Sequence, residues 1–128
     1  MNIITAAAIL TVLTVPDIPT DFKAYMDFRT ITNRESVQYR MQQSAETDEN
    51  GLRMYHGRYM VALGSYYGDV GDELTITLDT GTELDVVIGD LKADCETDRT
   101  NRYHPMEGGS GNIVEFIVDV RQLPEDAR

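Results

Sequence analysis

The stretch "ELTITLDTGTELDVVIGD", residues 73–90, predicts the fold more clearly than any other part of the chain. In its first half, apolar residues alternate with threonines, which is the period-two pattern of a strand with one buried face. The residues "DTG" at 79–81 have the composition of a turn, and the alternation resumes after them, so the stretch predicts a β-hairpin. The alternating apolar residues are Leu74, Ile76 and Leu78 in the first strand and Leu84, Val86 and Ile88 in the second strand.

Shorter strand patterns lie on both sides of this hairpin. "LRMYHGRYMVALG" (52–64) predicts a tight turn at His56-Gly57 and a strand over residues 58–63. "NIVEFIVDV" (112–120) follows the glycine-rich "EGGSG" and predicts a last strand, and a short strand is expected around residues 25–28. Several short strands separated by glycine-marked turns indicate a small, mostly β domain.

One short helix is predicted near residues 33–45. "TNRE" (32–35) has the spacing of a capping box, in which a threonine hydroxyl and a glutamate three residues later satisfy the free amides of a helix start. The expected buried face carries Val37, Met41 and Ala45. The expected water-facing side chains are Gln38, Arg40 and Gln42.

Length and charge limit the classes of function. The chain has 128 residues, which is the size of one ordinary domain, and we expect a single β-barrel domain over residues 22–128. Its net charge is −11, so nucleic acid and anionic membranes are not expected partners. Its single cysteine excludes an intrachain disulfide.

The first 21 residues form an apolar segment with several interpretations. Residues 3–15 resemble the apolar part of an export signal, although no Lys or Arg precedes them. The same residues also fit a buried strand, or a helix docked on a partner. Because an uncovered apolar stretch associates with other surfaces, residues 3–15 predict a homo-oligomer or a docked partner.

Two stretches carry a resemblance to a known family. "RYMVALGSYYGDVGDELTITLDTGTELDVVIGDLKAD" (58–94) and "NIVEFIVD" (112–119) resemble the double-psi β-barrel of the three-aspartate domain found in Gram-positive cell-wall proteins. That domain is similar in turn to the barrels of membrane-bound lytic transglycosylase A and rare lipoprotein A. The resemblance implies a six-stranded double-psi β-barrel with one short N-terminal helix. Small proteins of Gram-positive bacteria and their phages look similar.

The function implied by this resemblance concerns peptidoglycan. In the transglycosylase relatives one aspartate protonates the glycosidic oxygen and then acts as base, while the 6-hydroxyl of the sugar closes onto the anomeric carbon. Asp90 matches that aspartate, and Glu115 occupies the place of the aspartate in the final strand. The expected partner is the glycan strand of peptidoglycan, and the expected location is extracellular, at the cell surface or in a virion. No cofactor is expected, since the chain has no phosphate-cradling glycine motif.

The chain departs from the family pattern in ways that keep other functions open. The first family aspartate would fall in "VALGSYYG" (61–68), which contains none, and Leu91 and Lys92 replace a glycine pair. A nearby Lys92 is expected to lower the pKa of Asp90, which opposes a general-acid role. The alternatives are therefore an inactive relative that binds glycan, or a structural protein that assembles through its N-terminal segment.

The remaining candidate residues each have an ordinary structural interpretation beside the functional one. Tyr66 and Tyr67 are candidates for stacking on sugars, or half-buried barrel tyrosines. Asp94 is a candidate substrate-binding residue, or a solvated charge in the loop formed by residues 88–105. No metal site is predicted, because the acidic residues of this loop lack the spacing of a calcium loop and His104 has no second histidine at ligand spacing. Carboxylates surround Cys95, which favours an inert thiol over a nucleophile.

Overall fold

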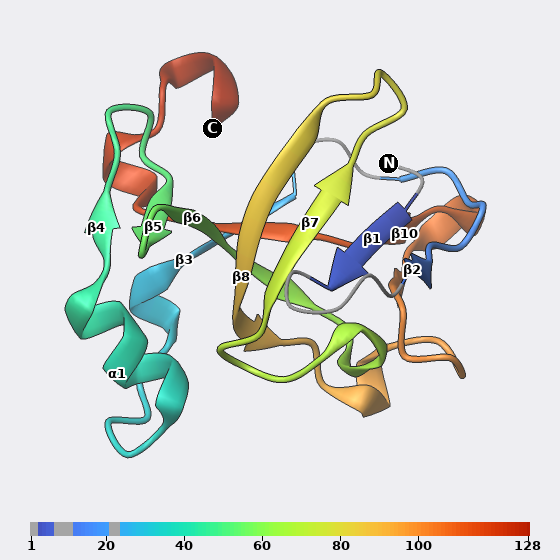
Figure 1. Cartoon of the computed structure of the whole chain (residues 1–128), viewed down its shortest axis with the longest axis horizontal. Coiled ribbons are helices and arrows are strands. Elements are labelled where there is room, and N and C mark those ends of the chain that lie inside the picture. The colour runs from blue at the N-terminus through green and yellow to red at the C-terminus, as the bar shows by residue number, and fades with distance from the viewer. Residues whose placement is uncertain (1–2, 7–11, 21–23) are drawn as a thin grey trace.

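The computed structural model describes residues 3–6, 12–20 and 24–128, and these form a mostly β structure with one α-helix (Figure 1). Short 3₁₀ turns connect several of the strands. The helix is α1 (Val37–Ser44). The strands are β1 (Ile3–Ala6), β2 (Val12–Thr14), β3 (Tyr25–Asp27), β4 (Glu46–Thr47), β5 (Arg53–Tyr55), β6 (Arg58–Leu63), β7 (Glu73–Thr77), β8 (Glu83–Leu91), β9 (His104–Pro105), β10 (Gly111–Asn112) and β11 (Glu115–Val118).

The hairpin and the tight turn expected from the sequence are confirmed. β7 and β8 pair antiparallel from Thr77↔Glu83 next to the turn to Glu73↔Val87 at the far end. They lie in the middle of the molecule in Figure 1. β5 and β6 pair through Tyr55↔Arg58, and both residues of the connecting turn, His56 and Gly57, have positive φ. Such a two-residue turn matches the twist of the strands that it joins.

The main sheet is mixed. Its strand order is β2-β1-β7-β8-β6-β11-β3, and β4 and β5 attach beside β6. β6 runs parallel to β8, and β11 runs parallel to β3, whereas the other pairs are antiparallel. Within the described residues no pairing joins the end strands β2 and β3, so the six-stranded closed barrel is not confirmed.

Apolar residues cover both faces of this sheet. Because side chains alternate along a strand, Val61 and Leu63 of β6 enter one core, while Met60 enters another. The larger core lies against β1, β7 and β8 and includes fully buried Ile4 and Ile76. The smaller core lies under α1 and consists of Met41, Met60, Val87 and Ile117.

The helix begins later than its predicted capping box. Asn33 accepts a hydrogen bond from the Glu35 amide and holds residues 33–36 in a turn, so the helix starts only after Ser36. The Ser36 hydroxyl caps it by accepting from the Tyr39 amide at 3.1 Å. The predictions for Gln42 and Val37 are also wrong, because only 5% of Gln42 is exposed whereas 47% of Val37 is.

The described part of the N-terminal segment belongs to the same sheet as the rest of the chain. β1 pairs with β7 over four residues and with β2, and Ile4 is fully buried. The sheet therefore extends across the division expected near residue 21. Of the strand and helix interpretations of the N-terminal segment, residues 3–6 and 12–14 adopt the strand. The other part of this prediction, on residues 7–11, lies outside the described residues. No described helix is long and apolar enough to cross a membrane.

Candidate functional site

Asp90 and Glu115 lie on either side of Ala62 in the sheet. Asp90 of β8 pairs with Ala62 of β6, and Glu115 of β11 pairs with Ala62 from the other edge of β6. Directly paired residues project from the same face of a sheet, so both acids lie on the face that also carries Met60 and α1. Two strand spacings separate their Cα atoms, which corresponds to about 10 Å.

A bulge in β8 determines which face Asp90 occupies. The register moves from Val61↔Ile88 to Ala62↔Asp90, which leaves Gly89 as an extra residue without a partner. Without this bulge Asp90 would fall beside Leu63, on the face of the larger apolar core. Gly89 suits the position because a Cβ there would lie 2.8 Å from the Ile117 Cδ1 atom. β8 continues past the bulge to Leu91, so Asp90 lies within the strand rather than in a turn after it.

Lys92 pairs with Glu115. The Lys92 side chain is only 6% exposed, and its Nζ donates to Glu115 Oε1 and to Asn112 Oδ1, both at 2.9 Å. This ammonium group is held by two acceptors from the β10–β11 segment. Asn112, itself 9% exposed, was not singled out by the sequence, although a polar residue at the head of an apolar strand is a signal for a buried hydrogen bond.

Burial raises the pKa of Asp90 above its ordinary value. The Leu91 amide and the Gln38 side chain of α1 each donate a hydrogen bond that lowers the pKa, the Glu115 charge raises it, and the Lys92 charge lowers it least. The net direction is upward. The prediction that a nearby Lys92 would lower this pKa is confirmed in direction, but burial outweighs the effect of its charge.

Comparisons of the chain with protein-family models, curated proteins and solved structures found no match.

Asp94 lies at one end of the sheet and joins two chain segments. Its Oδ1 accepts a hydrogen bond from the Ser65 hydroxyl at 2.6 Å. Ser65 follows β6 and Asp94 follows β8, and Lys92 N–H donates to Leu63 O at 2.9 Å between these segments. Asp94 is exposed, so its other oxygen is open to solvent or ligand.

Asp98 organises the loop rather than lying free in solvent. Its carboxylate accepts from the backbone amides of Thr100, Arg102 and Tyr103 and from the Thr100 hydroxyl. Although burial acts in the opposite direction, these hydrogen bonds lower the pKa of Asp98 to about 2. The loop then packs against the turn after β6, where a Cβ on Gly64 would lie 2.1 Å from the Asn101 carbonyl oxygen.

The two candidate tyrosines have different surroundings. Tyr67 is 3% exposed, and burial raises the pKa of its phenol, so the ring is part of the core and the predicted stacking on sugars does not hold for it. Tyr66 is 40% exposed, and its hydroxyl lies 3.0 Å from the Thr14 hydroxyl. The guanidinium of Arg102 lies 5.6 Å from the Tyr66 ring centroid, which leaves the rest of that ring as a candidate contact surface.

The remaining reactive residues form no cluster within the described residues. Cys95 is a free, exposed thiol, and His104 lies in β9 opposite Asn112. In residues 3–6, 12–20 and 24–128 there is no group of three or more His, Cys, Asp or Glu side chains placed to hold a metal ion.

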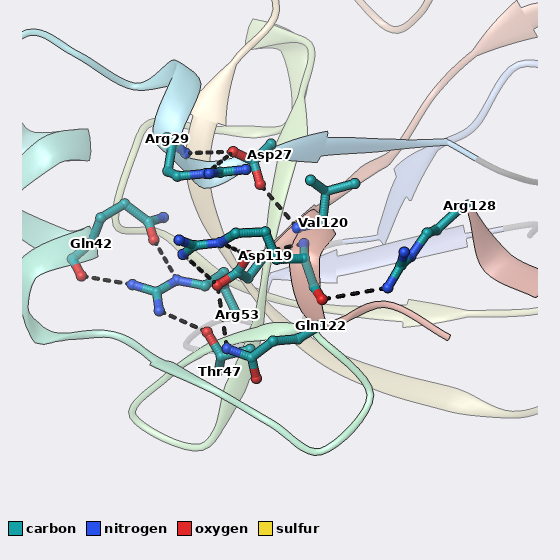
Figure 2. Close-up of polar contacts among 10 residues, drawn as sticks. Asp27, Arg29, Gln42, Thr47, Arg53, Asp119, Val120, Gln122 and Arg128 are labelled. Atoms are coloured by element: carbon teal, nitrogen blue, oxygen red, sulfur yellow. Dashed lines mark hydrogen bonds and ion pairs between the residues drawn. The ribbon is translucent and has the colours of Figure 1, made fainter. Parts of the chain in front are cut away.

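A second polar cluster surrounds Arg53 behind α1, and Figure 2 shows its contacts. Arg53 is 8% exposed, and its guanidinium donates to the Gln42 side chain, the Gln42 carbonyl oxygen and the Thr47 hydroxyl at 2.8–2.9 Å. Burial lowers the pKa of Arg53, while the charges of Asp119 and Asp27 raise it. The cluster joins α1, β4 and β5, and the sequence did not predict it, because Arg53 falls within an ordinary period-two pattern.

Proposed function

We propose that this chain is a peptidoglycan-associated protein of the double-psi β-barrel type, in which Asp90 cleaves the glycan strand as acid and then base. The observation that carries the proposal is the placement of Asp90. It is partly buried beside Glu115, and its pKa is raised, while the nearby cation Lys92 is held by Glu115. A raised pKa keeps the proton on a carboxyl group that must donate it near neutral pH.

The proposed step needs no water and no cofactor. Asp90 gives its proton to the glycosidic oxygen as the bond from that oxygen to the anomeric carbon breaks. The oxygen of the 6-hydroxyl group of the same sugar bonds to the anomeric carbon, and its proton returns to the Asp90 carboxylate. The enzyme is restored, and the sugar is left as a 1,6-anhydro product. Because peptidoglycan lies outside the cell membrane, this proposal places the protein at the cell surface or in a virion.

The first experiment is an analysis of the products formed from purified Gram-positive peptidoglycan. Incubation with the protein should release fragments that end in a 1,6-anhydro sugar, 18 Da lighter than a hydrolysed end, as measured by mass spectrometry. Heat-denatured protein is the control. Fragments with ordinary reducing ends would reject the proposed step, and binding without any fragments would reject cleavage in favour of the inactive, glycan-binding relative.

A second candidate function, assembly through the N-terminal hairpin, is supported by exposed apolar residues at the sheet end. β2 is an end strand in the described sheet, Val12 is 61% exposed, and Ile3 is 36% exposed. An end strand with apolar side chains is a template for pairing with another chain. Val12→Lys should therefore lower the sedimentation coefficient of any oligomer, while Val37→Lys, at a 47% exposed position on α1, should not. A wild-type protein that sediments as a monomer at high concentration would reject this candidate.

A further inference from the structure

A pocket of about 360 Å³ lies beside α1, and its polar lining includes two arginines. The 3₁₀ turn at Phe28–Thr30, the segment after it and the helix α1 form its walls. We call it the Arg34 pocket. Its lining residues are Phe28, Arg29, Ile31, Thr32, Arg34, Tyr39, Gln42 and Gln43.

The Arg34 pocket is locally cationic on an acidic protein. Among the described residues its lining contains two arginines and no acidic residue, whereas the whole chain has a net charge of −11. Arg34 makes no hydrogen bond or ion pair with any described residue, so its guanidinium is available to a ligand. The Nε of Arg29 pairs with Asp27 (Figure 2), and the Arg29 side chain is 46% exposed.

The floor of the pocket adds positive potential and apolar surface. The buried Arg53 guanidinium lies 4.1 Å from the centroid of the Phe28 ring, so a positive charge stands behind that ring. Phe28 and Ile31 supply apolar surface that also packs on the smaller core. Tyr39 and Gln43 supply a hydroxyl and an amide, which can bond to a peptide group.

We propose that the Arg34 pocket binds the terminal carboxylate of a short peptide whose last residue is small and apolar. A planar guanidinium matches a carboxylate through two parallel hydrogen bonds, and the Phe28–Ile31 floor fits a small aliphatic side chain. A polyanion such as a chain of phosphates is a poorer fit, because the rest of the surface repels it. This inference does not depend on glycan cleavage, since the pocket contains neither Asp90 nor Glu115.

The experiment measures binding of N-acetyl-alanyl-alanine and of its C-terminal amide by amide chemical-shift titration. The acid should bind with a Kd on the order of 1 mM and at least about fivefold more tightly than the amide, because two exposed arginines supply a modest charge-assisted gain. The shifts should centre on residues 28–43. Arg34→Gln should remove this preference for the acid, and Arg99→Gln should leave it unchanged. Arg99 is an exposed arginine outside the pocket, and its replacement removes the same charge.

Three results would overturn the proposal. The first is equal affinity for the acid and the amide. The second is an equal loss of the preference for the acid in the Arg34→Gln and Arg99→Gln variants. The third is inorganic phosphate binding the pocket as tightly as the peptide. The Asp90→Asn variant separates this proposal from the proposed function, because peptide binding should persist in it whether or not glycan is cleaved.

Discussion

Replacing Asp90 with asparagine should reduce the release of glycan fragments from peptidoglycan by about 10³-fold, because positioned proton transfer contributes about 10²- to 10⁴-fold to such reactions. Asparagine keeps the shape of the side chain and an oxygen that can accept from the Leu91 amide, but it has no acidic proton to donate. The measurement is the initial rate of fragment release, with zymography on cell-wall glycan as a second readout.

The fold should survive this substitution, so a loss of activity is interpretable. Burial raises the pKa of Asp90, which means that the folded state disfavours the ionised carboxylate relative to the unfolded state. A neutral side chain at this position should therefore leave the free energy of unfolding at pH 7 unchanged or higher. Asp85→Asn is the matched control, since Asp85 is exposed on the same strand and accepts from Thr75. An Asp90→Asn variant as active as wild type would reject the role of Asp90.

The pH dependence of the wild-type rate follows from the same shift. The acid must be protonated to donate, so the rate should fall as the pH rises through the raised pKa of Asp90, which lies above the ordinary value of 3.8. The stability contribution has the same direction, because the unfolded state ionises first and stability decreases as the pH rises toward the folded pKa. A rate that increases with pH across this range would contradict the acid role.

The local patterns of the sequence predicted hairpins well but could not predict how distant strands meet. Alternation in residues 73–90 determines which side chains share a face, and the turn residues determine the register, so β7 and β8 followed from the sequence. The parallel pairing of β6 with β8 brings together two strands that have β7 between them in the sequence, and no local pattern encodes such a choice. The closed barrel, which depended on a resemblance, likewise remains part of the proposed function.

The candidate site shows the same limit at the level of side chains. The sequence resemblance proposed Asp90 and Glu115 as a pair, and the pairing of both strands with β6 places them on one face. The partner of Lys92 could not be predicted, because a long side chain beside Asp90 in sequence can reach an acceptor on another strand. The raised pKa of Asp90 depends on burial, which only the packing of α1 and the sheet reveals.

The largest loss of stability is expected from Arg53→Met, which removes a buried cation from between α1, β4 and β5. The guanidinium makes three hydrogen bonds and stacks on the Phe28 ring, so its loss leaves the buried side-chain oxygen of Gln42 without a donor (Figure 2). The carbonyl oxygen of Gln42 keeps the hydrogen bond from the Ala45 amide. An orphaned buried acceptor costs about 1–3 kcal/mol. The substitution also removes a positive charge near Asp119, which is 2% exposed.

We therefore expect Arg53→Met to lower the free energy of unfolding by about 3 kcal/mol, as measured by urea denaturation at constant m value. Arg53→Lys should lie between it and wild type, because an ammonium keeps the charge but cannot reproduce the planar set of donors. Arg29→Met is the control, since Arg29 is 46% exposed in its ion pair with Asp27, and such pairs contribute less than about 1 kcal/mol. If Arg53→Met costs no more than Arg29→Met, the buried network does not stabilise the fold. The attachment of α1 to the sheet, which brings Gln38 to Asp90, would then have to come from the apolar contacts of Met41 with Met60 and Ile117.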